Sequence, residues 1–331
     1  MIDLVKQLVA CDSPSGHERT VRDLVKQLAT PYADELHVDG LGNLIVRKGK
    51  KTSNGLRVML SAHLDEIGLI ASHVDENGFV RVSNLGVVHA PYCLGQRVRF
   101  LNGVPGVIGH EIEGFSSESL TLDKLFVDVG ASSPQDCPVQ VGDVAVFQRT
   151  FQEINGRWTG KALDNRVSVA ILLEALRRLG GSPHEIYFVF SVLEEVGRKG
   201  AGPAAFGIDP DVALAVDVTA TGDTPKGRRM AVTLGKGPAV KVKDAGIIAA
   251  PSVVAWITAA AGQLGIPLQR EILMKGATDA SMIQLARAGV PSGGISIPAR
   301  YIHSPVEMVA EQDVQQALAL LIQLLENPVQ L

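Results

Sequence analysis

Two patterns of hydrophobicity follow each other along this chain of 331 residues, and their order is what most limits its fold. Residues 1–66 and 157–331 alternate short apolar runs, typical of buried strands, with apolar stripes at helical spacing. Residues 67–156 carry only β-like runs, separated by turn signals such as Asn77-Gly78 and Asn102-Gly103. The simplest architecture is an α/β domain made from both ends of the chain, with a small all-β domain inserted in the middle.

The outer regions can be divided further into elements. Strands are expected at 35–38, 43–47, 58–62, 186–192, 212–218 and 293–297. Helices are expected at 169–179, 253–264, 279–288 and 314–325, and another should contain Val21, Leu24, Val25 and Leu28. Ser15 and Glu18 have the spacing of a capping box at the start of that helix.

Composition excludes several classes of partner. The 31 Lys and Arg residues against 35 Asp and Glu residues leave a net charge of −4, which does not favour binding to nucleic acid. No apolar stretch reaches the roughly 18 residues of a membrane span, and the N-terminus does not read as a signal peptide. Three scattered cysteines (Cys11, Cys93 and Cys137) fit a reduced compartment. We therefore expect a soluble cytoplasmic protein without nucleic-acid or membrane partners.

Residues able to bind a metal follow several of the predicted strands or lie in loops. They are His63, Asp65, Asp164, Glu194, Glu195, Asp217 and His303. Imidazole and carboxylate together suit zinc, cobalt or manganese. Two-metal hydrolytic sites need a bridging oxygen ligand and several terminal ligands, and this set can supply both. The H-E-x-x-H, P-loop and G-x-S-x-G patterns are absent from the chain.

The sequence around these residues resembles that of a known family over nearly the whole chain. The matching stretches are Ser61–Gly68, Gly160–Arg166, Glu194–Gly197, Asp217–Thr219 with Gly222–Pro225, Thr278–Ala280, and Arg300–Pro305. Six motifs in this order resemble the tetrahedral (TET-type) aminopeptidases, a family that includes glutamyl and deblocking aminopeptidases. The resemblance implies a mixed-sheet α/β/α metallopeptidase domain formed by 1–66 and 157–331. It also implies that the inserted β domain (67–156) shapes dimer contacts and the openings of the assembly.

The resemblance also implies roles for individual residues. Asp164 would bridge two metal ions, His63 and Asp217 would complete one site, and Glu195 and His303 would complete the other. Glu194 would be the general base, and Asp65 would orient His63. The expected cofactors are two divalent ions per subunit, Zn²⁺ or Co²⁺ ahead of Mn²⁺. The expected partners are short peptide substrates and other copies of the chain, as dimers or as dodecamers built from dimers.

Other functions remain open at this stage. A related di-metal amide hydrolase, such as a carboxypeptidase or a deacylase, would use the same ligands. An endoglucanase-type glycosidase would use Glu194 and Glu195 as paired carboxylates, although such pairs usually come from separate elements. A non-enzymatic scaffold would make the whole ligand set coincidental. Lys241, Lys243, Lys275 and Arg300 either favour an acidic N-terminal residue or are simply solvated.

Overall fold

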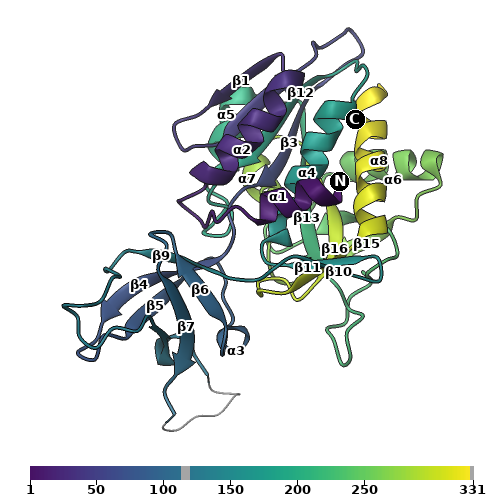
Figure 1. Cartoon of the computed structure of the whole chain (residues 1–331). Helices are drawn as coiled ribbons and strands as arrows, with labels where there is room; N and C mark the ends of the chain where they lie inside the picture. Colours follow the sequence, from purple (N-terminus) through teal and green to yellow (C-terminus); the bar gives the residue numbers. More distant parts are fainter. Residues whose placement is uncertain (113–119, 329–331) are drawn as a thin grey trace.

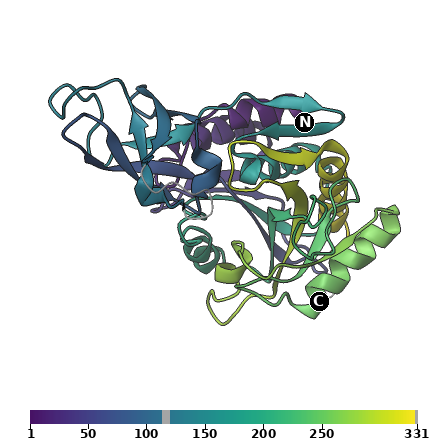
Figure 2. The ribbon, with the colours of Figure 1, turned by 90° about the horizontal axis from the view of Figure 1, so that it is seen from below.

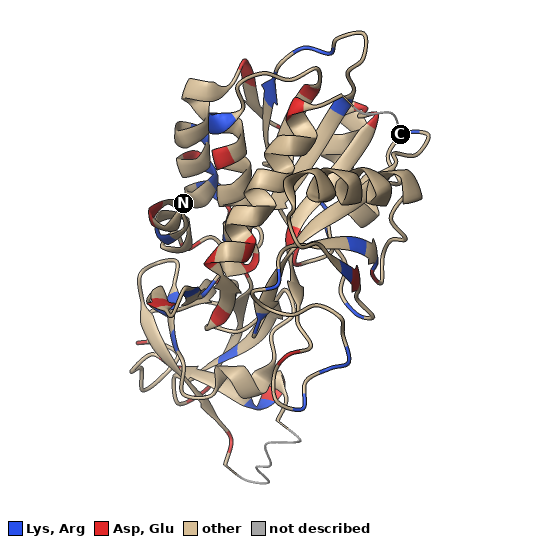
Figure 3. Cartoon of the chain, turned by 90° about the vertical axis from the view of Figure 1, so that its right-hand side faces the viewer, with Lys and Arg blue, Asp and Glu red and all other residues tan. Residues whose placement is uncertain are grey.

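The computed structural model describes residues 1–112 and 120–328 and has two parts, a large mixed sheet with helices and a smaller β-barrel (Figure 1). Both termini lie on the sheet part, so the barrel is formed from the middle of the chain. Seen from below, the barrel projects to one side of the sheet part, away from α6 (Pro251–Leu264) (Figure 2). Lys and Arg are interspersed with Asp and Glu over both parts (Figure 3).

The large sheet has eleven strands, nine of them in the order β1-β2-β12-β3-β13-β16-β17-β11-β10. These nine are β1 (Glu35–Val38), β2 (Leu44–Lys48), β12 (Glu185–Ser191), β3 (Arg57–His63), β13 (Val212–Ala220), β16 (Ser292–Arg300), β17 (Glu307–Ala310), β11 (Arg157–Gly160) and β10 (Gln152–Ile154). Beside β16 lies β14 (Ala239–Lys243), which pairs with β15 (Gln269–Ile272). The central strands β12, β3, β13 and β16 are parallel, the outer pairs of the nine-strand order are antiparallel, and β14 is antiparallel to β16 but parallel to β15. The prediction of a mixed α/β fold is confirmed.

Helices cover both faces of this sheet, because successive side chains of its buried strands point to opposite sides. Val58 and Leu60 of β3 pack among one set of helices, whereas Met59 between them packs among another. The first set is α1 (Ile2–Val9), α2 (Arg19–Ala29), α4 (Leu163–Arg178), α6 and α8 (Glu311–Glu326). The second set is α5 (Ala201–Ile208) and α7 (Ala280–Ile283). The continuous apolar runs of the central strands therefore match a sheet that is buried on both faces.

The barrel closes in the strand order β4-β5-β8-β7-β6-β9. Its strands are β4 (Gly68–Val74), β5 (Val80–Leu85), β8 (Leu125–Asp128), β7 (Pro105–His110), β6 (Arg97–Phe100) and β9 (Val144–Phe147). Alternate residues such as Val98 and Phe100 point inward and form a core separate from that of the sheet. A single helical turn, α3 (Ala90–Cys93), follows β5. Closure leaves no unpaired strand edge within the barrel.

Two local expectations differ from the structure. A helix was expected at 279–288, but α7 ends at Ile283, and the chain then continues as turns toward β16. Ser15 and Glu18 do not form a capping box, since the N-cap of α2 has no side-chain hydrogen bond. Both side chains are buried and are used elsewhere, as described below.

The described residues contain no helix that is both long and apolar enough to cross a membrane.

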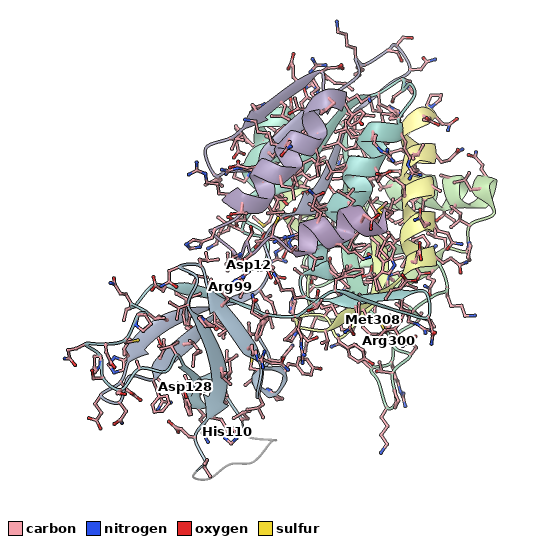
Figure 4. The ribbon with its side chains drawn as sticks, viewed as in Figure 1. Asp12, Arg99, His110, Asp128, Arg300 and Met308 are labelled. Carbon is pink, nitrogen blue, oxygen red and sulfur yellow. The ribbon has the colours of Figure 1, made fainter. Side chains whose placement is uncertain are left out.

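An ion-pair network joins the two parts of the molecule. Arg99 of the barrel donates through Nε to Asp12 Oδ2 at 3.0 Å, and these two side chains meet at the junction in Figure 4. Lys161 Nζ lies 3.2 Å from Asp12 Oδ1 and 2.7 Å from Glu66 Oε2. Since Glu66 also faces Arg166, both Asp12 and Glu66 have cations beside them.

Candidate metal centre

A cavity of about 880 Å³ lies where the central parallel strands end. His63 is the last residue of β3, Asp217 lies in the C-terminal half of β13, and Glu194 follows β12 by three residues. The carboxyl ends of parallel strands are the usual place for a ligand crevice in open α/β sheets. All three residues line the cavity, together with Asp164, Glu195 and His303. The barrel side contributes Val87 and His89, which follow β5.

Two groups of three potential metal ligands lie on the cavity floor. One contains His63, Asp164 and Asp217, the other contains Asp164, Glu195 and His303, and the ligand atoms of each group lie within 4.8 Å of one another. The five residues that the sequence analysis named as ligands are therefore brought together. Asp164 belongs to both groups.

Asp164 faces both histidines through different oxygens. Its Oδ1 lies 3.1 Å from His63 Nε2, and its Oδ2 lies 3.4 Å from His303 Nε2. His63 Nε2 is also 3.7 Å from Asp217 Oδ1, and His303 Nε2 is 3.2 Å from Glu195 Oε2. This is the arrangement that a carboxylate bridging two ions requires, with one oxygen directed to each side.

The donor set fits divalent metal ions. Glu195 Oε1 is buried and has no hydrogen-bond partner among the described residues, so an acceptor is left unsatisfied on the cavity floor. Burying an acceptor without a partner is costly, and a cation would remove that cost. Imidazole nitrogens with carboxylate oxygens are the ligands that zinc, cobalt and manganese prefer.

Protons compete for the same positions. Burial lowers the pKa of His303, but the carboxylates of Glu195 and Asp164 outweigh it and raise this pKa to about 11. Burial raises the pKa of Asp164, but hydrogen bonds to His303 and His63 hold it well below its usual value. Metal ligands must be deprotonated, so binding of an ion here would release protons from the imidazoles.

Glu194 belongs to neither ligand group but lies beside them in the same cavity. Its side chain is buried, and burial, followed by the charges of Asp217 and Glu195, raises its pKa well above the usual value, against the lowering effect of His63. A buried glutamate with a raised pKa that faces a cavity is suited to accept and return a proton.

Asp65 contacts His63 mainly through its backbone. His63 Nδ1 lies 3.0 Å from the Asp65 main-chain oxygen and 3.5 Å from its carboxylate Oδ1. The carboxylate instead accepts the backbone N–H groups of Glu194 and Glu195, each at 3.1 Å. Ser15 Oγ donates to the same carboxylate at 2.6 Å. Asp65 therefore fixes the backbone of the two glutamates as well as the ring of His63.

Glu18 supports the same loop from the other side. Its Oε1 accepts the backbone N–H of Leu193 at 3.1 Å and that of Gly16 at 2.8 Å. The residues that looked like a helix cap thus hold the segment carrying the glutamates. Tertiary packing buries Ser15 and Glu18, and this burial explains why they support the loop rather than cap the helix.

The sequence analysis missed two residues near the centre. Glu307 is buried and accepts backbone N–H groups from Asp164 and His303. Its signal was available, because it is a charge at the start of the otherwise apolar strand β17. His89 lines the cavity, but it lies in the region for which the sequence predicted only β-strands. No motif around it indicated a role in the site.

The four basic residues considered for substrate preference differ in their contacts and in whether they line the cavity. Lys241 is buried against Glu271, and Arg300 pairs with Asp223 at 2.7 Å. Lys243 Nζ donates to the backbone oxygen of Asp244. Of the four, Lys275 lines the cavity, where it is accompanied by the unforeseen cations Arg198, Arg228 and Arg229.

Comparison with known proteins gives a consistent picture. The family model described as M42 glutamyl aminopeptidase matches residues 42–320. Lysyl aminopeptidase of Pyrococcus furiosus is 35% identical over 341 residues, covering 98% of this chain and 96% of that protein. The structure of an aminopeptidase from the archaeon Desulfurococcus kamchatkensis superposes with a TM-score of 0.93 at 41% identity, covering 98% and 94% of the two chains. The TET1 peptidase of Pyrococcus horikoshii, which can assemble into a tetrahedron or a large octahedral shell, gives 0.86 at 30% identity, covering 98% and 99%.

Proposed function

This chain belongs to the M42 glutamyl aminopeptidase family of peptide hydrolases, and on that premise we propose that it removes N-terminal residues from short peptides by a two-metal mechanism. One observation carries the proposal. Two ligand groups share Asp164, whose carboxylate oxygens face opposite histidines. A single-metal site would not require a second group of three ligands around the same carboxylate.

His63, Asp164 and Asp217 would hold one ion, and Asp164, Glu195 and His303 the other. We propose Zn²⁺ or Co²⁺ as the natural ions, with Mn²⁺ as a further choice, because all three accept mixed nitrogen and oxygen ligands. When bound, the ions would lower the pKa of a water and polarise the scissile carbonyl.

Glu194 is the proposed general base. Its position beside both ligand groups lets it take a proton from the attacking water and return that proton to the leaving amine. Burial raises its pKa, which favours holding the proton before its return to the leaving amine. Asp65 would keep His63 and the two glutamates in place through the hydrogen bonds described above.

We propose that the barrel, assigned to the inserted domain at 67–156, mediates contacts between subunits in a dimer-based homo-oligomer. The solved structure of the PhTET1-12s dodecamer, which is 30% identical to this chain, supports a dodecamer. Light scattering tests this proposal, and a monomer in solution would contradict it. A cytoplasmic location remains a prediction from the sequence.

The preferred N-terminal side chain does not follow from family membership. The family is described by glutamyl substrates, whereas the Pyrococcus furiosus relative is a lysyl aminopeptidase. The cavity also carries both signs of charge, carboxylates on its floor and Arg228, Arg229 and Lys275 elsewhere in its lining. Substrate ranking must therefore come from experiment.

The test is hydrolysis of aminoacyl-p-nitroanilides by chelator-stripped protein, with and without added Zn²⁺, Co²⁺ or Mn²⁺. We expect activity restored by metal on substrates with a free amine, and no activity on their N-acetylated counterparts. Cleavage of the acetylated substrates would indicate a deacylase-type or other amide hydrolase instead. No metal-restored cleavage of the nitroanilides or of short free-amine peptides would overturn the proposal.

A further inference from the structure

Glu307 is a buried acid to which neither ligand group nor the proposed chemistry assigns a role. It is the first residue of β17 and is 2% exposed. In the sheet it lies opposite Gly160 of β11, four residues before Asp164. The pairing of β17 with β11 thus brings this carboxylate to the segment that carries the bridging ligand.

Each oxygen of Glu307 accepts a hydrogen bond from a different ligand residue. The Asp164 N–H donates to Oε2 at 2.8 Å, and the His303 N–H donates to Oε1 at 3.0 Å. Asp164 and His303 are far apart in sequence, and in the structure they belong to one ligand group. The carboxylate therefore links the backbones of two ligands directly.

The backbone of His303 needs such a partner. Its φ is +62°, in the left-handed region that residues other than glycine seldom occupy. This conformation costs energy and persists where the surrounding structure enforces it. The hydrogen bond from the His303 N–H to Glu307 is one contact that enforces it.

Asp65 shows the same arrangement at the segment that carries Glu194 and Glu195. Its two carboxylate oxygens accept the N–H groups of Glu194 and Glu195, each at 3.1 Å. Asp65 and Glu307 together therefore fix the backbone of Asp164, Glu194, Glu195 and His303. The shared pattern makes an incidental role for Glu307 a poor explanation.

We propose that Glu307 is a positioning residue that sets the separation of Asp164 and His303, and thereby the affinity of the Asp164–Glu195–His303 site for its ion. This inference rests on the proposed two-metal function and extends it. Outer residues that orient metal ligands typically contribute about 10- to 100-fold in metal affinity.

Substitution by glutamine separates this role from packing. Glu307→Gln keeps the shape of the side chain but has one oxygen acceptor and an amide group that only donates. One of the two ligand N–H groups then faces a donor, so the link between Asp164 and His303 is broken. Glu307→Asp keeps two accepting oxygens but is one methylene shorter, and we expect a smaller effect from it.

Asp313 provides the matched control. It is fully buried at the first turn of α8 and accepts the N–H groups of Gly235 at 2.7 Å and Gly237 at 2.8 Å. It is thus a buried carboxylate with two backbone bonds to a loop that carries no proposed ligand. Asp313→Asn should disturb folding stability without changing the metal centre.

The experiment is calorimetric titration of metal-stripped full-length protein with Co²⁺, together with the visible absorption of bound Co²⁺. The wild type should bind two ions per subunit. Glu307→Gln should bind one of them about 10- to 100-fold more weakly and show an altered Co²⁺ spectrum, whereas Asp313→Asn should match the wild type. The thermal unfolding of each metal-free variant reports the structural cost separately.

Unchanged affinity for both ions in Glu307→Gln would overturn the proposal, as would an equal loss in Asp313→Asn. If Glu307→Gln does not fold, Glu307→Asp decides, and wild-type affinity in that variant contradicts the role. A wild type that binds fewer than two ions would instead contradict the two-metal function itself.

Discussion

Buried carboxylates gather in two neighbouring regions that differ in what neutralises them. Between β14, β15 and β16, the carboxylate of Glu271 contacts Lys241, and Asp244 lies 3.7 Å from the same ammonium. Thr219 and Ser296 donate to Glu271 as well. On the cavity floor, by contrast, three carboxylates and Glu194 face two imidazoles, and no Lys or Arg ion pair involves them among the described residues.

The difference separates structural from functional acids. A buried charge is tolerated when it is paired and hydrogen-bonded, as Glu271 is. The acids of the cavity floor outnumber the two imidazoles that face them, and burial raises the pKa of Glu195 as it does that of Glu194. An excess of buried negative charge that faces a cavity is what a cation site requires, whereas the Lys241 cluster requires no further partner.

The largest effect is expected at Glu194, which has no Lys or Arg ion pair among the described residues and belongs to neither ligand group. Glu194→Gln removes the proposed proton acceptor while keeping its shape, so kcat should fall by about 10²- to 10⁴-fold. Metal content, measured by mass spectrometry, and unfolding temperature should stay close to those of the wild type. Turnover close to that of the wild type would mean that another residue is the general base, and it would weaken the contrast between the cavity floor and the Lys241 region.

In the region around Lys241 and Glu271, by contrast, a substitution should lower stability. Lys241→Met leaves Glu271 buried without its cation, and the free energy of unfolding should fall by about 3–5 kcal/mol. Denaturant unfolding measures the loss, and metal content should be unchanged in the folded fraction.

Two further variants control this prediction. Adding Glu271→Gln to Lys241→Met removes the uncompensated charge and should recover part of the stability. Lys275→Met, at an exposed residue without an ion pair among those described, should change the free energy of unfolding by no more than about 0.5 kcal/mol. If Lys275→Met destabilised the protein as much as Lys241→Met, the contrast between the two regions would fail.

Removing the metal should destabilise the cavity floor. Its carboxylates then lose their proposed counter-charge, and an ion supplied at about 100 times its Kd should stabilise the native state by about 2.7 kcal/mol. Thermal unfolding in chelator and in graded Zn²⁺ measures the effect. Asp164→Asn, which alters the ligand common to both groups, should lose most of the Zn²⁺ dependence. Identical unfolding of the wild type in chelator and in Zn²⁺ would argue against ion binding.

The smallest effect is expected at Asp223, a partly exposed acid with its own cation. Burial raises its pKa, but the hydrogen bonds from Arg300 outweigh this and lower the pKa to about 2. Since the folded pKa lies below the unfolded value of 3.8, the stabilisation is complete above about pH 4 and is lost as the pH falls toward 2. Asp223→Asn should cost about 1 kcal/mol at pH 7. Most of that difference should be lost by pH 2 in denaturant unfolding, and an undiminished difference there would contradict the assigned cause.

The pattern of apolar residues along the chain predicted the strands that are buried over nearly their whole length. The run Val212–Val218 predicted most of β13 because every residue there is apolar except Asp217, and that exception also marked a site residue. The same reasoning would have marked Glu307 at the start of β17, but the short strand had not been identified. Helix α5 was missed because its Ala, Gly and Pro residues give no amphipathic stripe.

Elements whose ends depend on packing were less predictable. Ser15 and Glu18 have the spacing of a helix cap, yet the structure uses both to hold the segment around Glu194. Lys241 was expected to be either a substrate-facing or a solvated cation, yet it is buried and β15 brings Glu271 to it. In each case a partner distant in sequence competes with the local interaction, and a pattern read along the chain cannot show which of them wins.

The sequence by itself therefore determined the mixed α/β class, the β-only middle region and the chemical types of the residues at the strand ends, because hydrophobic periodicity and residue chemistry are properties of the chain. Tertiary structure decided which carboxylates pair with Lys or Arg and which gather around two histidines. That choice depends on strand order, which sets Lys241 beside Glu271 and Asp164 between two histidines. Electrostatic energy in a buried site depends on distance and desolvation, and both exist only after folding.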